Sequence, residues 1–394
     1  MRTQTDIRQR ERAQVAHRSG RPGTRHWWAV ARVAAVGALL AIGPAAGPVV
    51  ARSHAARTAS DAVSVFASAP APGHPFGIAV GDGRVYVSTS AGDFFADPAH
   101  GGHLNSEDER VFTYDEDGNL LDSTVIDTAD NSDMGLFGLA LDGNPGPKHQ
   151  LFVADMNGRI LTVGLGAHSG APKVFSQVPI DSGLAGDWML SMWNDLAFDK
   201  TGNLYVPDDK PRIWRVSPDG TAHIWFTDPR LTGLFGFAGG PLGGRIDPTG
   251  QWLYISITIA AEFAPSPDST IYRIRLVDHP TAADMQLVHR FVASPDPTVA
   301  PPQATGLAFA KSGNLYVSLL GPNQVAVLNP AGDEIRRISD PRFFSPWGLA
   351  FMGNSLLVTN GDLEPGDHPE HWQIFKVNVG ETGLPLNRPR VPVN

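Results

Sequence analysis

The chain has 394 residues, a formal net charge of −9 and no cysteine, and 42% of its residues are hydrophobic, enough for a sizeable core. The absence of cysteine excludes disulfides, thiol nucleophiles and thiolate metal sites. The acidic balance argues against nucleic acid as a partner, because phosphate binding needs a basic face.

Residues 1–55 have the pattern of an export signal. The first 26 residues are polar and carry seven Arg and no Lys, and an apolar stretch follows from Trp27. Small residues then lead to Ser53-His-Ala55, which would serve as a cleavage site. We therefore expect a secreted, periplasmic or cell-surface protein. An uncleaved anchor is the alternative, and it is the only membrane contact that the sequence suggests.

One sequence motif, which we call the repeated word, recurs along the rest of the chain. It consists of a short apolar segment, a polar turn and a second apolar segment. Its third copy runs from Asp195-Leu-Ala-Phe through the turn Asp199-Lys-Thr-Gly-Asn to Leu-Tyr-Val206. The other copies begin at Gly77, Gly138, Gly244 (a degenerate copy), Gly306 and Gly348. Six copies predict a repeat architecture.

Each copy predicts two short strands joined by a tight turn in which Gly takes a positive φ. Two more strands follow in most copies, which gives a four-stranded antiparallel unit of about 40 residues, a propeller blade. The sixth copy lacks its fourth strand, whereas Ala62–Pro70 precedes the first copy as an unassigned strand. We predict an all-β, six-bladed β-propeller over residues 62–380, its ring closed by this N-terminal strand. Residues 381–394 form a proline-rich tail.

In a propeller the first strand of each blade lines a central channel, and the residue that opens this strand lies near one mouth. In the six copies the opening residues are Phe76, Phe137, Asn194, Leu242, Thr305 and Trp347. Only Asn194 and Thr305 offer oxygen, whereas a hard cation takes six or more oxygen ligands. The aromatic members predict either an apolar funnel for a ligand or packing that fills the channel.

The segment from Trp193 to Asp208, followed by Arg212-Ile-Trp-Arg-Val-Ser-Pro-Asp-Gly220, resembles the SMP-30/gluconolactonase/LRE-like superfamily of six-bladed propellers. The Gly-Asn-Leu-Tyr-Val words also resemble NHL repeats, and the architecture is that of TolB-like propellers. The likeness spans about residues 62–380.

In the hydrolytic members, a divalent cation, typically calcium, is held by a Glu, one or two Asn and an Asp. The resemblance places Asn194 on an Asn position. The Glu position holds Phe76, and the late Asp position holds Thr305. A lactonase-type metal site is therefore either lost or rebuilt from loops.

Two predicted loops carry His-x-x-His with carboxylates nearby: His100 and His103 in the first blade, His368 and His371 in the sixth. These blades are neighbours across the ring seam, and imidazole with carboxylate suits zinc. The sequence leaves open a seam metal site and ordinary solvated loop histidines.

Three aspartates follow second strands at the same mouth: Asp155, Asp208 and Asp209. They could accept N–H bonds within turns, or they could contact a cation or substrate beside Asn194.

The sequence leaves two alternative functions open. The first is a metal-dependent lactone or ester hydrolase with a degenerate metal site, with Asn194, Asp208 and Asp209 as its catalytic candidates. The second is a non-catalytic, NHL-like propeller that binds a small molecule or a protein at its mouth. Its contacts would be Phe76, Phe137, Asp155, Thr305 and Trp347.

Overall fold

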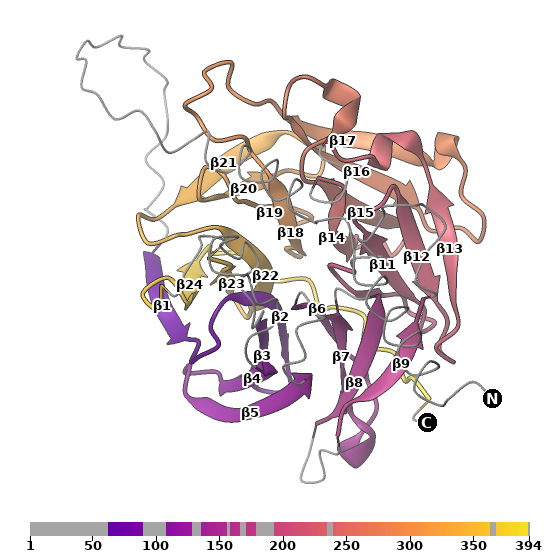
Figure 1. The fold of residues 1–394 in the computed structure, drawn as a ribbon, viewed down its shortest axis with the longest axis vertical. Coiled ribbons are helices and arrows are strands. Elements are labelled where there is room, and N and C mark those ends of the chain that lie inside the picture. The colour runs from indigo at the N-terminus through magenta and orange to yellow at the C-terminus, as the bar shows by residue number, and fades with distance from the viewer. Residues whose placement is uncertain are drawn as a thin grey trace, which may run out of the picture. The chain divides into compact units, whose positions relative to one another are not determined.

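The computed structural model describes residues 62–89, 108–127, 135–155, 158–165, 171–178, 193–234, 239–362 and 368–392. These residues form six four-stranded antiparallel sheets that stand as blades around a ring (Figure 1). The expected all-β, six-bladed propeller is confirmed. Residues 296–299 belong to a second unit and hold a turn in which the Thr298 N–H donates to Asp296.

Each blade is a meander that begins with its inner strand. Blades 1 and 2 are β2 (Pro75–Gly81), β3 (Arg84–Thr89), β4 (Glu109–Asp115) and β5 (Leu120–Asp127), then β6 (Leu136–Leu141), β7 (Gln150–Asp155), β8 (Arg159–Gly164) and β9 (Lys173–Gln177). Blades 3 and 4 are β10 (Ala197–Phe198), β11 (Leu204–Asp208), β12 (Arg212–Val216) and β13 (Ala222–Thr227), then β14 (Pro241–Ile246), β15 (Trp252–Ile257), β16 (Ser269–Arg275) and β17 (Met285–Phe291). Blades 5 and 6 are β18 (Ala304–Phe309), β19 (Leu315–Leu319), β20 (Gln324–Leu328) and β21 (Glu334–Ser339), then β22 (Pro346–Met352), β23 (Ser355–Asn360), β24 (Gln373–Asn378) and β1 (Ala62–Ser68).

Helical structure in the described residues is confined to single 3₁₀ turns. They are η2 (Gly146–Lys148), η3 (Pro229–Leu231), η4 (Ala261–Phe263) and η5 (Ala282–Asp284). None of the helices found there is long and apolar enough to cross a bilayer.

The N-terminal strand β1 closes the ring, as the unassigned strand predicts. It pairs antiparallel with β24, from Ala62 opposite Asn378 to Ser68 opposite Gln373. Phe66 of this strand is buried in the core of the seam between blades 6 and 1. The first strand thereby covers the edge that β24 would otherwise expose.

The recurring glycine has a packing cause. A Cβ at Gly77 would stand 1.9 Å from the carbonyl oxygen of Phe137 in the next blade, and one at Gly306 would stand 2.1 Å from that of Trp347. Real Cβ atoms do not come so close, so a larger residue would push neighbouring inner strands apart. The repeated word therefore reflects how tightly the blades meet at the channel.

A hydroxyl group joins neighbouring blades beside this glycine. In blade 4, Ser256 Oγ accepts a bond of 2.7 Å from the Gly243 N–H and donates one of 2.7 Å to the Thr305 carbonyl in blade 5. Ser88 makes the same bridge from blade 1 to blade 2, and Thr359 makes it from blade 6 to blade 1.

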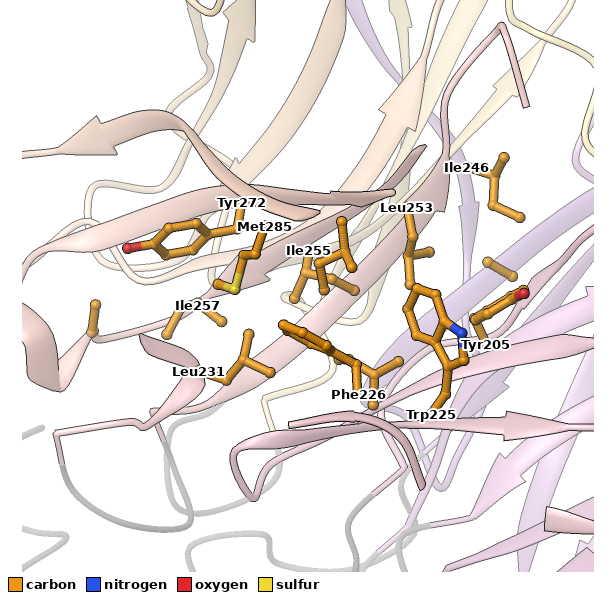
Figure 2. Close-up of a cluster of buried hydrophobic side chains, with 14 residues drawn as sticks. Tyr205, Trp225, Phe226, Leu231, Ile246, Leu253, Ile255, Ile257, Tyr272 and Met285 are labelled. Atoms are coloured by element: carbon orange, nitrogen blue, oxygen red, sulfur yellow. The ribbon is translucent and has the colours of Figure 1, made fainter. Parts of the chain in front are cut away.

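The core lies between blades rather than at one centre. Figure 2 shows one such cluster, in which Tyr205, Trp225 and Phe226 of blade 3 face Leu253 and Ile255 of blade 4. All are at least nine-tenths buried. Alternation along each strand supplies one apolar face to each neighbouring blade.

We call the end at which the inner strands begin the top face and the end at which they finish the bottom face. The residues after β24, Glu381–Pro392 (the C-terminal segment, yellow in Figure 1), cross the bottom face. Leu384 N–H donates to Phe309 in blade 5, and Asn387 donates to Phe198 in blade 3. Val391 is 2% exposed within the core shared by blades 2 and 3. This part of the expected proline-rich tail is packed structure.

Candidate functional site at the top of the channel

Three of the predicted opening residues form one aromatic cluster at the top face. The Phe76 ring centroid lies 4.8 Å from that of Phe137 and 4.8 Å from that of Trp347, and the last two are 5.5 Å apart. Phe76 and Phe137 are at most 1% exposed, and Trp347 is 9% exposed. Of the two predicted arrangements, the packed one is present: the rings fill this part of the channel.

Asn194 and Thr305 also lie where the register predicts, on the channel wall. Both are buried, and the Asn194 carbonyl accepts a 3.0 Å bond from the Gly138 N–H of blade 2. With Trp347 they line a cavity of about 20 Å³. Such a space holds about one water molecule, so a ligand would have to lie over the mouth of the channel rather than within this cavity.

The described channel residues do not fit the calcium site of the hydrolytic members. Calcium takes six to eight oxygens with several carboxylates among them. At the position of the expected Glu, Phe76 is packed against two other rings, and the expected late Asp is Thr305. Within the described residues, no three His, Asp or Glu side chains come together as a metal cluster would require.

Asp155 and Asp208 hold equivalent places at the ends of β7 and β11. Each carboxylate is fully buried and binds the arginine four residues later, Arg159 or Arg212, in an ion pair. Asp208 also accepts a 2.8 Å bond from the Trp214 indole N–H. These contacts fasten the second strand to the third and give each carboxylate a positively charged partner.

Asp209 is placed differently from Asp208. Its side chain is 2% exposed, and its one bond among the described residues is a 3.2 Å contact from the Gly240 N–H to Oδ1. Burial raises the pKa of this carboxyl well above its ordinary value, and the charge of Asp208 raises it further, against the lowering effect of Gly240. Unlike Asp155 and Asp208, Asp209 forms no ion pair with an arginine among the described residues, and its raised pKa marks it as a candidate functional group.

Half of the predicted seam metal site can be examined, because His100 and His103 lie outside the described residues. His368 and His371 do lie together, with ring centroids 5.6 Å apart. His371 Nδ1 is 3.3 Å from the buried Asp362 carboxylate, and its ring stacks on Phe344 at 4.0 Å. The zinc site stays a prediction.

One charged pair in the channel wall was missed at the sequence level. Asp195 and Arg245 form an ion pair of 2.5 Å between blades 3 and 4, and both are less than 10% exposed. The signal was in the repeated word itself. Asp195 replaces the glycine of the other copies, and Arg245 replaces the alanine, as its pairing opposite Tyr254 shows.

No family model and no curated protein sequence matches this chain. Its fold is similar to that of many solved structures, including the following three. Regucalcin, a calcium-binding protein from Agrobacterium tumefaciens, is 16% identical over 84% of this chain and 99% of its own, with a TM-score of 0.56. A luciferin-regenerating enzyme is 12% identical over 84% and 100%, with a TM-score of 0.54.

A gluconolactonase from Xanthomonas campestris is 17% identical over 81% of this chain and 89% of its own, with a TM-score of 0.52. The resemblance carried by the repeated words is therefore confirmed as a shared propeller fold. At these identities the likeness says nothing about activity.

Proposed function

We propose that this protein is a binding propeller, which holds a small molecule or a protein partner at its top face and does not carry out calcium-dependent hydrolysis. The observation that carries the proposal is the cluster of Phe76, Phe137 and Trp347. One member of it, Phe76, occupies the channel position from which the resembling hydrolases would supply a Glu to their cation, and the other two rings pack against it. A fold shared with hydrolases is compatible with this, because function resides in the site rather than in the scaffold.

The test measures both calcium binding and hydrolytic activity. We expect added calcium and a chelator to leave the melting temperature of the protein unchanged, and the same result for Asn194→Ala. We also expect no turnover of γ- and δ-lactones or of aryl esters at any calcium concentration. A calcium-dependent rise in melting temperature that Asn194→Ala abolishes, or calcium-dependent lactone hydrolysis, would contradict the proposal.

The binding half of the proposal needs its own measurement. A thermal-shift screen of small molecules, together with cross-linking of protein partners, should yield a stabilising ligand or a partner. Its affinity should fall at least about tenfold, or 1.4 kcal/mol, in Trp347→Ala. Val292→Ala is the control, because Val292 is an exposed side chain. A ligand whose affinity is the same in both variants does not bind at the aromatic cluster.

A metal-dependent lactone or ester hydrolase remains the second candidate, and Asp209 favours it. Its buried carboxyl lies two residues after Pro207, whose carbonyl accepts the Asn194 N–H at 3.4 Å. A metal other than calcium could use this carboxylate with Asn194. Hydrolysis that requires manganese or zinc and is lost in Asp209→Asn, but not in Asp219→Asn at an exposed hairpin, would establish this candidate over the first.

Export is part of the proposal and rests on the basic and apolar leader alone. Mass spectrometry of the protein recovered from its native host should show either a mature chain that begins near residue 56 or an intact chain in the membrane fraction. Intact chain in the soluble cell interior would contradict export.

A further inference from the structure

The ion pair of Asp195 and Arg245 is out of place in a repeat that otherwise selects glycine and alanine. Asp195 Oδ2 accepts bonds from Arg245 Nη1 at 2.5 Å and from the Gly244 N–H at 3.0 Å. Burying two charges is costly, and small apolar residues close the same space in the other blades. A structural role in the wall does not require this pair, so its presence calls for another reason.

Arg245 lines the small top cavity and also a second cavity, which lies on the bottom side of the channel. This bottom cavity has a volume of about 150 Å³. Its walls include the repeat alanines Ala79, Ala140 and Ala197, and Leu384–Arg388 of the C-terminal segment form part of it. A space of this size accommodates a molecule about as large as benzene.

The guanidinium of Arg245 is only half used by the protein. Nη1 binds Asp195 and the Gly244 carbonyl at 2.7 Å, whereas Nε and Nη2 donate to no acceptor in the described part of the chain. These two donors form the edge that binds a carboxylate with two parallel bonds. A buried arginine that lines a cavity and leaves this edge unused among the described residues is a candidate anion site.

The charges around the bottom cavity support an anion. The described lining carries three positive side chains, Lys200, Arg245 and Arg388, of which Arg245 is paired with Asp195 and Arg388 with Asp82. The one carboxylate in the lining, Asp247, already accepts bonds from Thr249 and from two backbone N–H groups. The remaining lining is largely apolar, with the three alanines beside leucine and proline side chains.

We propose that the bottom cavity binds a small monocarboxylate, aliphatic or aromatic, with its carboxylate on Nε and Nη2 of Arg245 and its apolar part against the repeat alanines. Lys200 contributes long-range attraction. This site lies at the opposite end of the channel from the aromatic cluster, so the inference does not depend on the proposed function.

The test is calorimetric titration of the full chain with butyrate and benzoate at constant ionic strength, beside the neutral amides butyramide and benzamide. We expect saturable binding of at least one carboxylate, with a Kd between about 10 µM and 1 mM, as is ordinary for ligands of this size. The amide of the same shape should bind at least about tenfold more weakly, because it lacks the charge.

Two sets of variants locate the site. Asp195→Asn combined with Arg245→Gln removes both charges together, so that no lone charge stays buried, and it should abolish carboxylate binding. Lys200→Gln should weaken binding about threefold, whereas Lys311→Gln should not, because Lys311 holds the same turn position in blade 5 away from the cavity. The lysine pair keeps the test decisive if the double variant does not fold.

Three outcomes would overturn the proposal. They are the absence of saturable carboxylate binding, equal affinity for acid and amide, and equal affinity in the Lys200→Gln and Lys311→Gln proteins. Any of them would leave the ion pair as a wall element that contacts only water.

Discussion

At the scale of single residues, Asp209 offers the clearest link between burial and measurable behaviour. Its pKa is raised well above 3.8, so above pH 4 the folded protein keeps a proton that the unfolded chain releases. Stability is therefore lost as the pH rises from the unfolded pKa toward the folded one.

We predict that Asp209→Asn gains stability relative to the parent between pH 4 and pH 8. The gain should grow as the pH rises across this range, because the parent loses stability by keeping the Asp209 carboxyl protonated and the variant does not. Chemical denaturation at several pH values checks this. Asp219→Asn, at an exposed hairpin position, is the control and should follow the parent's pH profile. Parallel profiles for Asp209→Asn and the parent would show that the carboxyl is not held protonated.

The sequence predicts which residues line the channel better than it predicts how their side chains pack there. The word spacing located Phe76, Asn194 and Thr305 on the channel wall, because strand register follows from the repeat. Whether the aromatic residues form a funnel or a packed cluster depends on ring contacts across three blades, and no local pattern encodes these. Arg245 is visible in the sequence as a departure from the repeat, but its partner became clear only from the packing of the inner strands of blades 3 and 4 against each other.

At the scale of elements, the hydroxyl bridges between inner strands make a matched test possible. Ser256 and Ser318 hold the same position in blades 4 and 5, and both are fully buried. Ser256 bridges to the next blade, whereas Ser318 Oγ has no hydrogen-bond partner among the described residues.

Ser256→Ala should destabilise the protein by about 1–3 kcal/mol, because it leaves a buried N–H and a buried carbonyl without their partner. Ser318→Ala should be neutral or slightly stabilising, since it removes an unbonded hydroxyl. Denaturant titration of the two variants compares them directly. Equal losses would mean that side-chain volume, rather than the bridge, accounts for the effect.

The C-terminal segment shows where pattern-based prediction of elements stops. It has no alternating or helical period, and its contacts are single groups spread over several blades. Arg388 pairs with Asp82 of blade 1, and Glu381 accepts a 2.7 Å bond from the Tyr316 hydroxyl of blade 5. Proline-rich composition fits an ordered crossing and a loose tail equally well, so the packing of Val391 could not be foreseen.

At the scale of the whole molecule, ring closure by β1 should govern cooperativity. A chain of residues 62–394 should unfold with the melting temperature of the full protein. A chain of residues 69–394 should aggregate or lose its cooperative transition, because it exposes the edge of β24 and removes Phe66 from the seam. Burial of Phe66 alone contributes about 1.5–3 kcal/mol. Calorimetry of the two truncations checks this, and indistinguishable transitions would contradict it.

The direction of the closing strand also determines how the protein would be presented at a surface. Ala62 pairs with Asn378, the last residue of β24, so β1 starts at the bottom face. A leader retained as an anchor would reach the propeller through the ten residues 52–61, which span at most about 36 Å. Such a tether would join the propeller at its bottom face, the end that carries the bottom cavity, rather than at the end that carries the aromatic cluster.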